Sequence, residues 1–278
     1  MKVKETELHP FGLILTPTEQ GISVKDVDID YLRGLISKHQ LVTLRGFDHF
    51  SSSEEFSNYC ESWGEISLWP FGKVLELIEQ ENPQDHIFDN SYIPLHWDGM
   101  YREQVPELQI FHCAKAPGKD HGGRTVFSNT KMLLESISPK LKDEWNQVTA
   151  YYERKMEFYE SKTTAPLITK HPTKNYDVIR FCEPPKITGE EFINHPGFEL
   201  KGLSENNKSD FLSTLETALY SPANYYAHEW EDGDIVLSDN HTLLHGREAF
   251  TSGSARHLRR VQILDKTPLD NPHLVYTK

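Results

Sequence analysis

The chain has 278 residues, enough to bury a full core as one large domain, because β-barrels and β-sandwiches reach this size without dividing. Its 42 acidic and 29 basic residues give a net charge of −13, which argues against a nucleic-acid-binding or membrane-surface protein. Three cysteines, far apart at Cys60, Cys113 and Cys182, disfavour a disulfide framework and fit a reducing compartment.

The organisation of the chain predicts one domain over residues 1–278, since no linker, repeat or low-complexity tract divides it. Residues 1–7 lack the apolar run of a signal peptide, and no stretch reaches the length of a membrane span. We therefore expect a cytoplasmic protein that binds neither nucleic acid nor membrane. The sequence predicts nothing about its oligomeric state.

The first eighty residues predict three strands and two helices. The strands are expected at residues 11–15, 41–47 and 74–80. A helix over residues 28–39 places its apolar side chains on one face, and a second helix follows the capping sequence at residues 51–55. The aromatic side chains of the second helix are expected in the core.

The stretch from Pro94 to Tyr101 contains two metal-ligand residue types, His96 and Asp98, two positions apart. On an extended strand such positions project to the same side, so an imidazole and a carboxylate can reach one ion while Trp97 points away. A facial triad of non-haem iron requires a second histidine. Without one, a motif of this kind is more often a hydrogen-bonded surface pair than a metal site.

The rest of the chain predicts further strands, at residues 107–114, 124–127, 151–152 and 176–182, and helices at residues 130–148 and 204–220. His112 lies on the first of these strands and is expected to be a wall residue. After Pro222 the pattern changes to short strands with tight turns, at residues 225–230, 235–238 and 242–245. Short strands at this spacing favour a barrel or a sandwich.

The last informative stretch, Arg256 to Leu264, reads as a strand on which Arg256 and Arg260 share one face. Two inward arginines would enter the same cavity and, because a guanidinium grips carboxylates with two hydrogen bonds, would favour carboxylate-bearing small molecules. The alternative is a solvated basic face.

The order of His96, Asp98, Thr125, His245, Arg256 and Arg260 resembles that of the Fe(II)/2-oxoglutarate dioxygenases of the taurine dioxygenase family. The resemblance implies a mainly β fold with flanking helices, the double-stranded β-helix or jelly roll. It makes His96, Asp98 and His245 the ligands of Fe(II) and the catalytic centre, and it assigns the distal carboxylate of 2-oxoglutarate, the co-substrate used with O2, to Thr125 and Arg256. Arg124 departs from the acidic residue often seen before that threonine.

Other stretches are similar to the isonitrile-modifying oxygenases of paerucumarin and rhabduscin-type pathways: residues 68–77, 94–101, 181–185, 243–250 and 256–261. This similarity implies desaturation of an amino-acid-derived isonitrile, that of tyrosine or of tryptophan, made by an upstream isonitrile synthase. The substrate carboxylate is lost or kept, depending on the member. Substrate contacts are expected from Arg260, with Tyr92, Trp97 and Tyr101 around the ring, Phe88 and Tyr226 being comparable candidates. His241, His257 and Arg247 are expected to be structural.

Other functions remain open from the sequence. A taurine-dioxygenase-like hydroxylase of another small carboxylate or sulfonate would use the same residues. A zinc hydrolase could use two histidines and an aspartate with an open position, but it would not need Arg256 and Thr125. A non-catalytic jelly-roll binding protein would not need a redox metal. Dependence of turnover on iron and 2-oxoglutarate discriminates among them.

Overall fold

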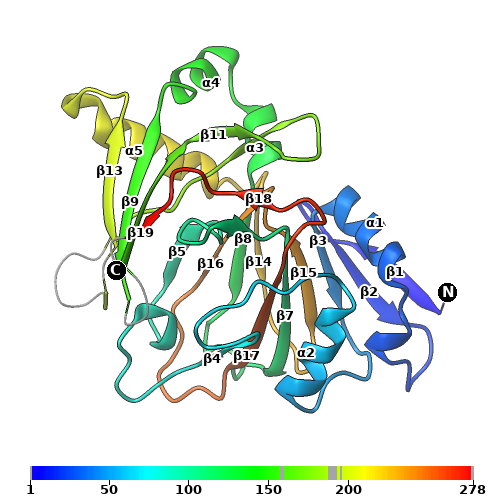
Figure 1. The fold of residues 1–278 in the computed structure, drawn as a ribbon. Coiled ribbons are helices and arrows are strands. Elements are labelled where there is room, and N and C mark those ends of the chain that lie inside the picture. Colours follow the sequence, from blue (N-terminus) through cyan, green and yellow to red (C-terminus); the bar gives the residue numbers. More distant parts are fainter. Residues whose placement is uncertain (1, 157–159, 187–192, 195, 277–278) are drawn as a thin grey trace.

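The computed structural model describes residues 2–156, 160–186, 193–194 and 196–276, and its core is formed by two β-sheets that face each other (Figure 1). In spatial order, the larger sheet contains β1 (Val3–Glu7), β2 (Leu13–Pro17), β3 (Leu41–Leu44), β15 (Ile235–Asp239), β7 (Leu108–Lys115), β17 (His257–Ile263) and β4 (Leu75–Ile78). The smaller sheet contains β14 (Tyr225–His228), β8 (Thr125–Asn129), β16 (Leu243–Arg247) and β5 (Ile93–His96).

Apolar side chains from both sheets meet in one buried cluster. Phe111 and Leu258 enter it from the larger sheet, and Phe127 and Leu243 enter it from the smaller one. All strand pairs in the two sheets are antiparallel except β2 with β3. This arrangement is the predicted jelly roll, and it leaves the space between the sheets as the natural place for a site.

Two helices cover the larger sheet, α1 (Ile29–His39) and α2 (Ser53–Glu61). Leu32 and Ile36 of α1 and Phe56 and Cys60 of α2 are buried in one cluster with side chains of that sheet. Ser52, within the predicted capping sequence, caps α2 by accepting a hydrogen bond from the backbone of Glu55. Asp28, expected as the first residue of the other helix, is instead the cap of α1 and accepts from the backbone of Tyr31.

A second layer lies beyond the smaller sheet (Figure 1). Its sheet contains β13 (Gly197–Lys201), β9 (Thr149–Lys155), β10 (Glu160–Pro166) and β19 (Val275–Tyr276), and its helices are α3 (Thr130–Ser136), α4 (Pro139–Trp145) and α5 (Glu205–Leu219). Short elements complete the fold: β11 (Ile168–Lys170) with β12 (Asp177–Ile179), β6 (Gln104–Val105) with β18 (Leu269–Asp270), and the 3-10 turns η1 (Val24–Asp26) and η2 (His86–Phe88).

The predicted elements are mostly confirmed, with shorter bounds in places. The strand expected at residues 41–47 ends at Leu44, because Gly46 has a φ of +78° that breaks the extended backbone. Helix α2 ends at Glu61, so Trp63 packs in the core from beyond it. The helical region at residues 130–148 divides into α3 and α4 at Ser138, which caps the second helix as expected.

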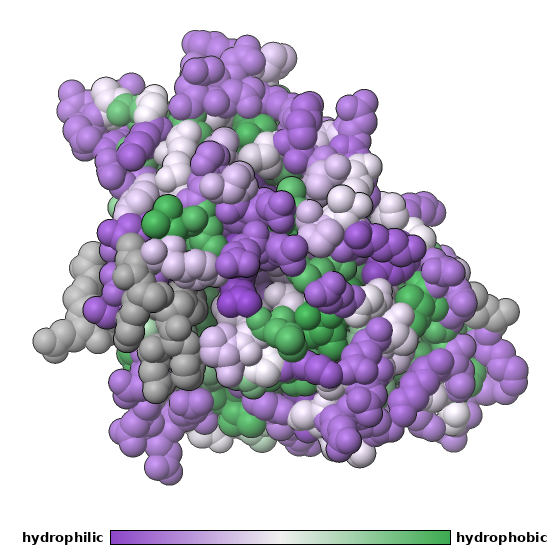
Figure 2. Space-filling model, in the orientation of Figure 1, coloured by the Kyte–Doolittle hydropathy of each residue, from purple (hydrophilic) through white to green (hydrophobic). Residues whose placement is uncertain are grey.

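The hydropathy of the surface agrees with a chain rich in charged residues. On the face shown in Figure 2, hydrophilic residues predominate and hydrophobic residues form small separate groups. Among the helices in the described part of the chain, none combines the length and the apolar character needed to span a membrane.

Candidate active site

The pairing of β5 with β16 brings the two predicted histidine ligands together. His96 ends β5 and lies opposite His245 in the antiparallel register, and the centres of the two imidazole rings are 4.1 Å apart. These residues are far apart in the sequence but adjacent in the smaller sheet. Both side chains face the larger sheet, where Gln109 of β7 lies 3.2 Å from Nε2 of His245.

Asp98 does not lie on the strand, which corrects the predicted geometry. Strand β5 ends at His96, and Asp98 starts a turn through Gly99, whose φ is +104°. A side chain at Gly99 would approach Pro106 to 2.8 Å, so the tight turn requires glycine. Asn240 holds the turn, because its amide accepts a hydrogen bond from the backbone N–H of Asp98 at 3.0 Å and donates one to the backbone carbonyl at 2.9 Å. The turn still directs the carboxylate to within 3.7 Å of His96 Nε2.

The donor set fits a divalent transition metal. One ligand atom each from His96, Asp98 and His245 can be chosen so that all lie within 4.8 Å of one another. The Nδ1 of His96 lies 2.9 Å from the carbonyl oxygen of Pro94, and a hydrogen bond there leaves Nε2 free to bind a metal. Two imidazoles and one carboxylate on one side of an ion form the facial triad of non-haem iron enzymes.

Electrostatics favours the metal-binding protonation states of these groups. Burial lowers the pKa of His96 and lowers the pKa of His245 well below its ordinary value, so both imidazoles stay neutral. Burial by itself would raise the pKa of Asp98, but the charge of Arg260, helped by the hydrogen bond from Gln262, lowers it below the usual range. The aspartate therefore remains an anion in a buried place.

One oxygen of Asp98 receives all the hydrogen bonds that reach its carboxylate from described residues. Arg260 forms an ion pair with Asp98, with Nη1 2.8 Å from Oδ2, and the side-chain amides of Gln109 and Gln262 donate hydrogen bonds to the same oxygen. The other oxygen, Oδ1, is left for a metal ion. The two glutamines belong to no motif in the sequence. Gln262 does fall on the same strand face as Arg260, and an inward polar residue at that position indicates a partner for a group in the site.

A cavity of about 1120 Å³ opens beside the triad. Of the predicted substrate residues, Arg260, Trp97 and Tyr101 line it, as does Phe88, whereas Tyr92 does not. The hydroxyl of Tyr92 instead accepts a hydrogen bond from the backbone N–H of Lys186. Trp97 lines part of the cavity, but its side chain packs in the buried cluster that also contains Leu95, with its ring centre 5.3 Å from the guanidinium of Arg180. It therefore points away from the side of His96, as expected. Tyr226, the other comparable candidate, lies outside the lining.

Glu183 is a further wall residue of this cavity that the sequence analysis did not single out. It accepts hydrogen bonds from the hydroxyl of Tyr220 at 2.6 Å and from the backbone of Leu95 at 3.3 Å, next to the metal ligand His96. Burial raises the pKa of its carboxyl. Its position within the motif at residues 181–185 was the only sequence signal for it.

Arg256 and Arg260 do not line the same cavity, contrary to the prediction. Strand β17 begins at His257, and its register with β7 shifts between His257 and Leu258, so Arg256 lies before the regular alternation. Arg260 lines the cavity beside the triad, and Arg256 does not.

The surroundings of Arg256 are nevertheless those of an anion site. Its side chain is 3% exposed, its Nε donates to the carbonyl of Gly123 at 3.0 Å, and within the described ranges no carboxylate pairs with it. Burial, followed by the charge of Arg247, lowers the pKa of Arg256 to about 9. Thr125 begins β8 two residues after Gly123, and its hydroxyl accepts a hydrogen bond from the indole of Trp230 at 3.1 Å. A buried, unpaired cation of this kind calls for an external anion.

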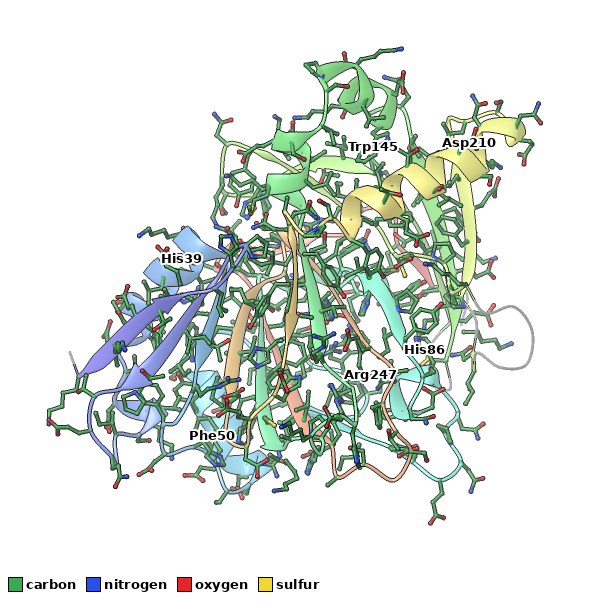
Figure 3. All side chains as sticks on the ribbon, turned by 180° about the vertical axis from the view of Figure 1, so that it is seen from behind. His39, Phe50, His86, Trp145, Asp210 and Arg247 are labelled. Atoms are coloured by element: carbon green, nitrogen blue, oxygen red, sulfur yellow. The ribbon has the colours of Figure 1, made fainter. Side chains whose placement is uncertain are left out.

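The residues that the sequence analysis took as structural have structural partners. Arg247 donates to the backbone carbonyls of His86, Ile87, Asp89 and Ser91, and Figure 3 shows its side chain on the same side of the molecule as that of His86. His257 pairs with Glu76, His241 contacts Arg180, and His112 is fully buried against the larger sheet. Arg124, the departure from the family pattern, forms a two-point ion pair with Glu248.

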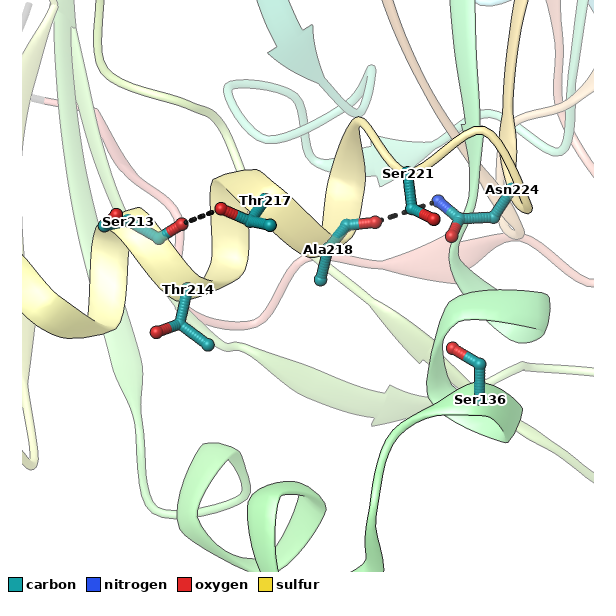
Figure 4. A pocket seen from close by; sticks show the side chains of 7 residues that line it. All are labelled: Ser136, Ser213, Thr214, Thr217, Ala218, Ser221 and Asn224. Carbon is teal, nitrogen blue, oxygen red and sulfur yellow. Dashed lines mark hydrogen bonds between the residues drawn. The ribbon is translucent and has the colours of Figure 1, made fainter.

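A second hollow, of about 440 Å³, lies between α5 and α3 (Figure 4). Its wall consists of small polar and apolar side chains: Ser136, Ser213, Thr214, Thr217, Ala218, Ser221 and Asn224. Several of these are already engaged, since Thr217 donates to the backbone of Ser213 and Asn224 to that of Ala218. Lacking a charged, nucleophilic or metal-binding group among its described lining residues, this hollow offers no chemistry.

Comparisons with known proteins agree with the geometry. Residues 8–262 match the family described as taurine catabolism dioxygenase TauD, TfdA family. The chain is 46% identical over 265 residues to the tyrosine isonitrile desaturase of Erwinia amylovora, covering 95% of this chain and 91% of the relative. It is 39% identical to the 3-((Z)-2-isocyanoethenyl)-1H-indole synthase of Fischerella ambigua, covering 92% and 94%.

A solved structure shows the same fold. The crystal structure of the PvcB protein from Pseudomonas aeruginosa superimposes with a TM-score of 0.85 at 41% identity, covering 99% of this chain and 96% of that chain. With the matched family spanning most of the chain and the three ligands gathered at one point, the chain belongs to the TauD, TfdA family and is an iron- and 2-oxoglutarate-dependent oxygenase whose facial triad is His96, Asp98 and His245.

Proposed function

We propose that the enzyme desaturates an amino-acid-derived isonitrile, that of tyrosine, to a vinyl isonitrile in secondary metabolism. The observation that carries this proposal is the 46% identity over 95% of the chain to a tyrosine isonitrile desaturase, combined with a triad that opens onto a cavity with a cationic residue, Arg260, in its wall. The relative from Fischerella ambigua makes an indole product, so the tryptophan-derived isonitrile is the competing substrate.

The co-substrate site that we propose consists of Arg256 and Thr125. A buried guanidinium without a carboxylate partner is unstable unless a ligand supplies the anion, and 2-oxoglutarate carries such a group at its distal end. The hydroxyl of Thr125 accepts the indole N–H of Trp230, so its own hydrogen can be donated to a carboxylate oxygen. Bound iron, with 2-oxoglutarate and dioxygen, supplies an oxidant able to remove hydrogen from a C–H bond.

The chain's own residues orient the substrate. Arg260, at the cavity wall and beside Asp98, is suited to hold the substrate carboxylate, which places the benzylic carbon close to the metal side. The rings of Trp97 and Tyr101 are 3% and 7% exposed, and in the cavity wall they pack against an aromatic substrate and exclude water. Tyr92 does not touch the substrate in this proposal. Its hydroxyl accepts a hydrogen bond from the backbone N–H of Lys186 and so holds that segment in place.

The proposed partners are small molecules. An isonitrile does not form spontaneously from an amino acid, so an upstream isonitrile synthase must deliver the substrate. The three cysteines are all free thiols, which supports a reducing compartment, and we place the enzyme in the cytoplasm. The single dioxygenase domain that we propose spans residues 1–278.

The test is a product assay with both isonitriles. The enzyme is incubated with Fe(II), 2-oxoglutarate, oxygen and either the tyrosine or the tryptophan isonitrile, and products are identified by mass spectrometry. We expect the tyrosine compound to lose two hydrogens, with or without carbon dioxide, in step with succinate formation. Hydroxylation instead of desaturation would support the taurine-dioxygenase-like alternative. Turnover with zinc and without 2-oxoglutarate would support a hydrolase.

A further inference from the structure

Two glutamines on adjacent strands hold the same carboxylate oxygen. Gln109 of β7 and Gln262 of β17 are direct partners in the antiparallel register, and the side-chain Nε2 of each donates to Oδ2 of Asp98. Both glutamines are almost completely buried, at 1% and 3% exposure. Buried amides are retained in a core only where their polar atoms are satisfied, so this pair is specifically placed.

Independent hydrogen bonds fix the orientation of both amides. The Oε1 of Gln262 lies 2.7 Å from Nε1 of Trp69, and because an indole nitrogen can only donate, the Nε2 of Gln262 must point to Asp98. The Oε1 of Gln109 accepts from the hydroxyl of Ser238 at 3.1 Å, and Ser238 is the register partner of Gln109 on β15. The larger sheet thus presents two oriented N–H donors to the metal ligand.

Trp69 connects this arrangement to the edge of the cavity. Trp69 lines the cavity and stacks on Phe71, with ring centres 5.6 Å apart. The guanidinium carbon of Arg102 lies 4.7 Å from the centre of the Trp69 ring. A continuous path of hydrogen bonds therefore runs from the cavity wall at Trp69 through Gln262 to Asp98.

We propose that Gln109 and Gln262 are positioning residues for the iron ligand Asp98, and that Trp69 sets the orientation of Gln262. By occupying Oδ2, the two amides fix the plane of the carboxylate, so that Oδ1, 3.7 Å from Nε2 of His96, would be the oxygen available to a metal ion. Partners of this kind, which orient a ligand without touching the metal, typically change metal affinity by about 10- to 100-fold when they are removed. This proposal rests on the iron site and not on the identity of the isonitrile.

The test measures binding of Mn(II), used alone, to the metal-free protein by the loss of the electron paramagnetic resonance signal of free Mn(II). Gln109→Leu and Gln262→Leu should each raise the dissociation constant by about 10- to 100-fold. Trp69→Phe keeps an aromatic ring but removes the N–H that orients Gln262, and it should raise the constant several-fold. Gln147→Leu, at an exposed glutamine beyond α4, is the matched control and should bind as the wild type does.

A second readout separates positioning from general loosening of the fold. In the anaerobic complex with Fe(II) and 2-oxoglutarate, the visible absorption band should shift in the Gln262→Leu and Trp69→Phe variants and stay in place in Gln147→Leu. Wild-type Mn(II) affinity in both leucine variants would overturn the proposal. If a leucine variant does not fold, Trp69→Phe decides, because Trp69 is only partly buried, and unchanged affinity and spectrum there would refute the role of Gln262. No isonitrile is used, so failure here is distinct from failure of the substrate assignment.

Discussion

Arg260 forms an ion pair with the metal ligand Asp98, with Nη1 2.8 Å from Oδ2, and Arg260 is also part of the cavity wall. The residue expected to bind the substrate is therefore also a partner of the metal ligand. A substrate carboxylate held by Arg260 would lie directly beside the ligand set. A substrate held in this way would tie its position to the geometry of the iron site.

Replacing Arg260 by glutamine should remove the preference for a carboxylated substrate. The wild-type enzyme should bind the tyrosine isonitrile much more tightly than its decarboxylated analogue, because losing one partner of a buried charge pair costs on the order of 2–5 kcal/mol. Affinities for both compounds are measured anaerobically with 2-oxoglutarate and saturating Mn(II), since the variant should also bind metal less tightly.

The matched control for this experiment is Arg259→Gln. Arg259 is the neighbour of Arg260 on β17 but faces away from the cavity. Its Nε lies 3.4 Å from Oε1 of Glu76. Its replacement should leave the discrimination between the two compounds intact. If Arg260→Gln discriminates as strongly as the wild type, Arg260 does not contact the substrate, and Arg154 or Lys155, the other cationic residues of the cavity wall, becomes the candidate.

Replacing a triad residue, His96, Asp98 or His245, by alanine should abolish iron-dependent turnover while the protein remains folded. Each contributes one ligand of three, and the site lies between sheets whose apolar clusters do not depend on it. Circular dichroism checks the fold, and succinate formation checks activity. For Asp98→Ala the assay is repeated without halide, because halide can take the place of the carboxylate in some relatives. Normal turnover of that variant would disprove the triad.

Replacing Arg256 by alanine should weaken binding of 2-oxoglutarate by on the order of 2–5 kcal/mol and affect the substrate far less. The reason is that Arg256 is buried without a carboxylate partner of its own among the described residues, whereas Arg260 lines the substrate cavity. Arg124→Ala removes a nearby arginine whose exposed ion pair with Glu248 is worth at most about 1 kcal/mol, and it should leave both ligands unaffected. Equal weakening of both ligands by Arg256→Ala would disprove the division of roles.

The sequence was sufficient to predict the ligand set but not how the ligands meet. The types and order of His96, Asp98 and His245 carry chemical information, whereas the turn at Gly99 that aims Asp98 depends on Asn240, which is distant in the sequence. The expectation that Arg256 shares the cavity of Arg260 was wrong for a similar reason, because Arg256 precedes β17 and the extent of a cavity depends on several strands together.

Two strands were not predicted for a different reason. β1 is mostly exposed and polar, and β10 consists mainly of polar residues, so neither has the apolar pattern on which strand prediction depends. Their extended form comes from pairing with neighbours, β1 with β2 and β10 with both β9 and β19. Tertiary pairing decided what the local sequence left open.

Acid should destabilise the protein in part through His241. Burial, followed by the charge of Arg180, lowers the pKa of His241 from 6.5 to about 3. As the pH falls below about 6.5, the unfolded chain therefore binds the proton first, and stability that is fully present above that pH is lost progressively toward pH 3. At pH 5 the loss of unfolding free energy from this one residue should be on the order of 1–2 kcal/mol.

His241→Asn keeps an acceptor for Arg180 but cannot titrate. Between pH 7.5 and pH 5, its free energy of unfolding, measured with urea, should therefore fall less than that of the wild type. The control is His273→Gln, at an exposed histidine, whose free energy of unfolding should fall as much as that of the wild type. An equal drop in His241→Asn would show that other groups carry the acid sensitivity.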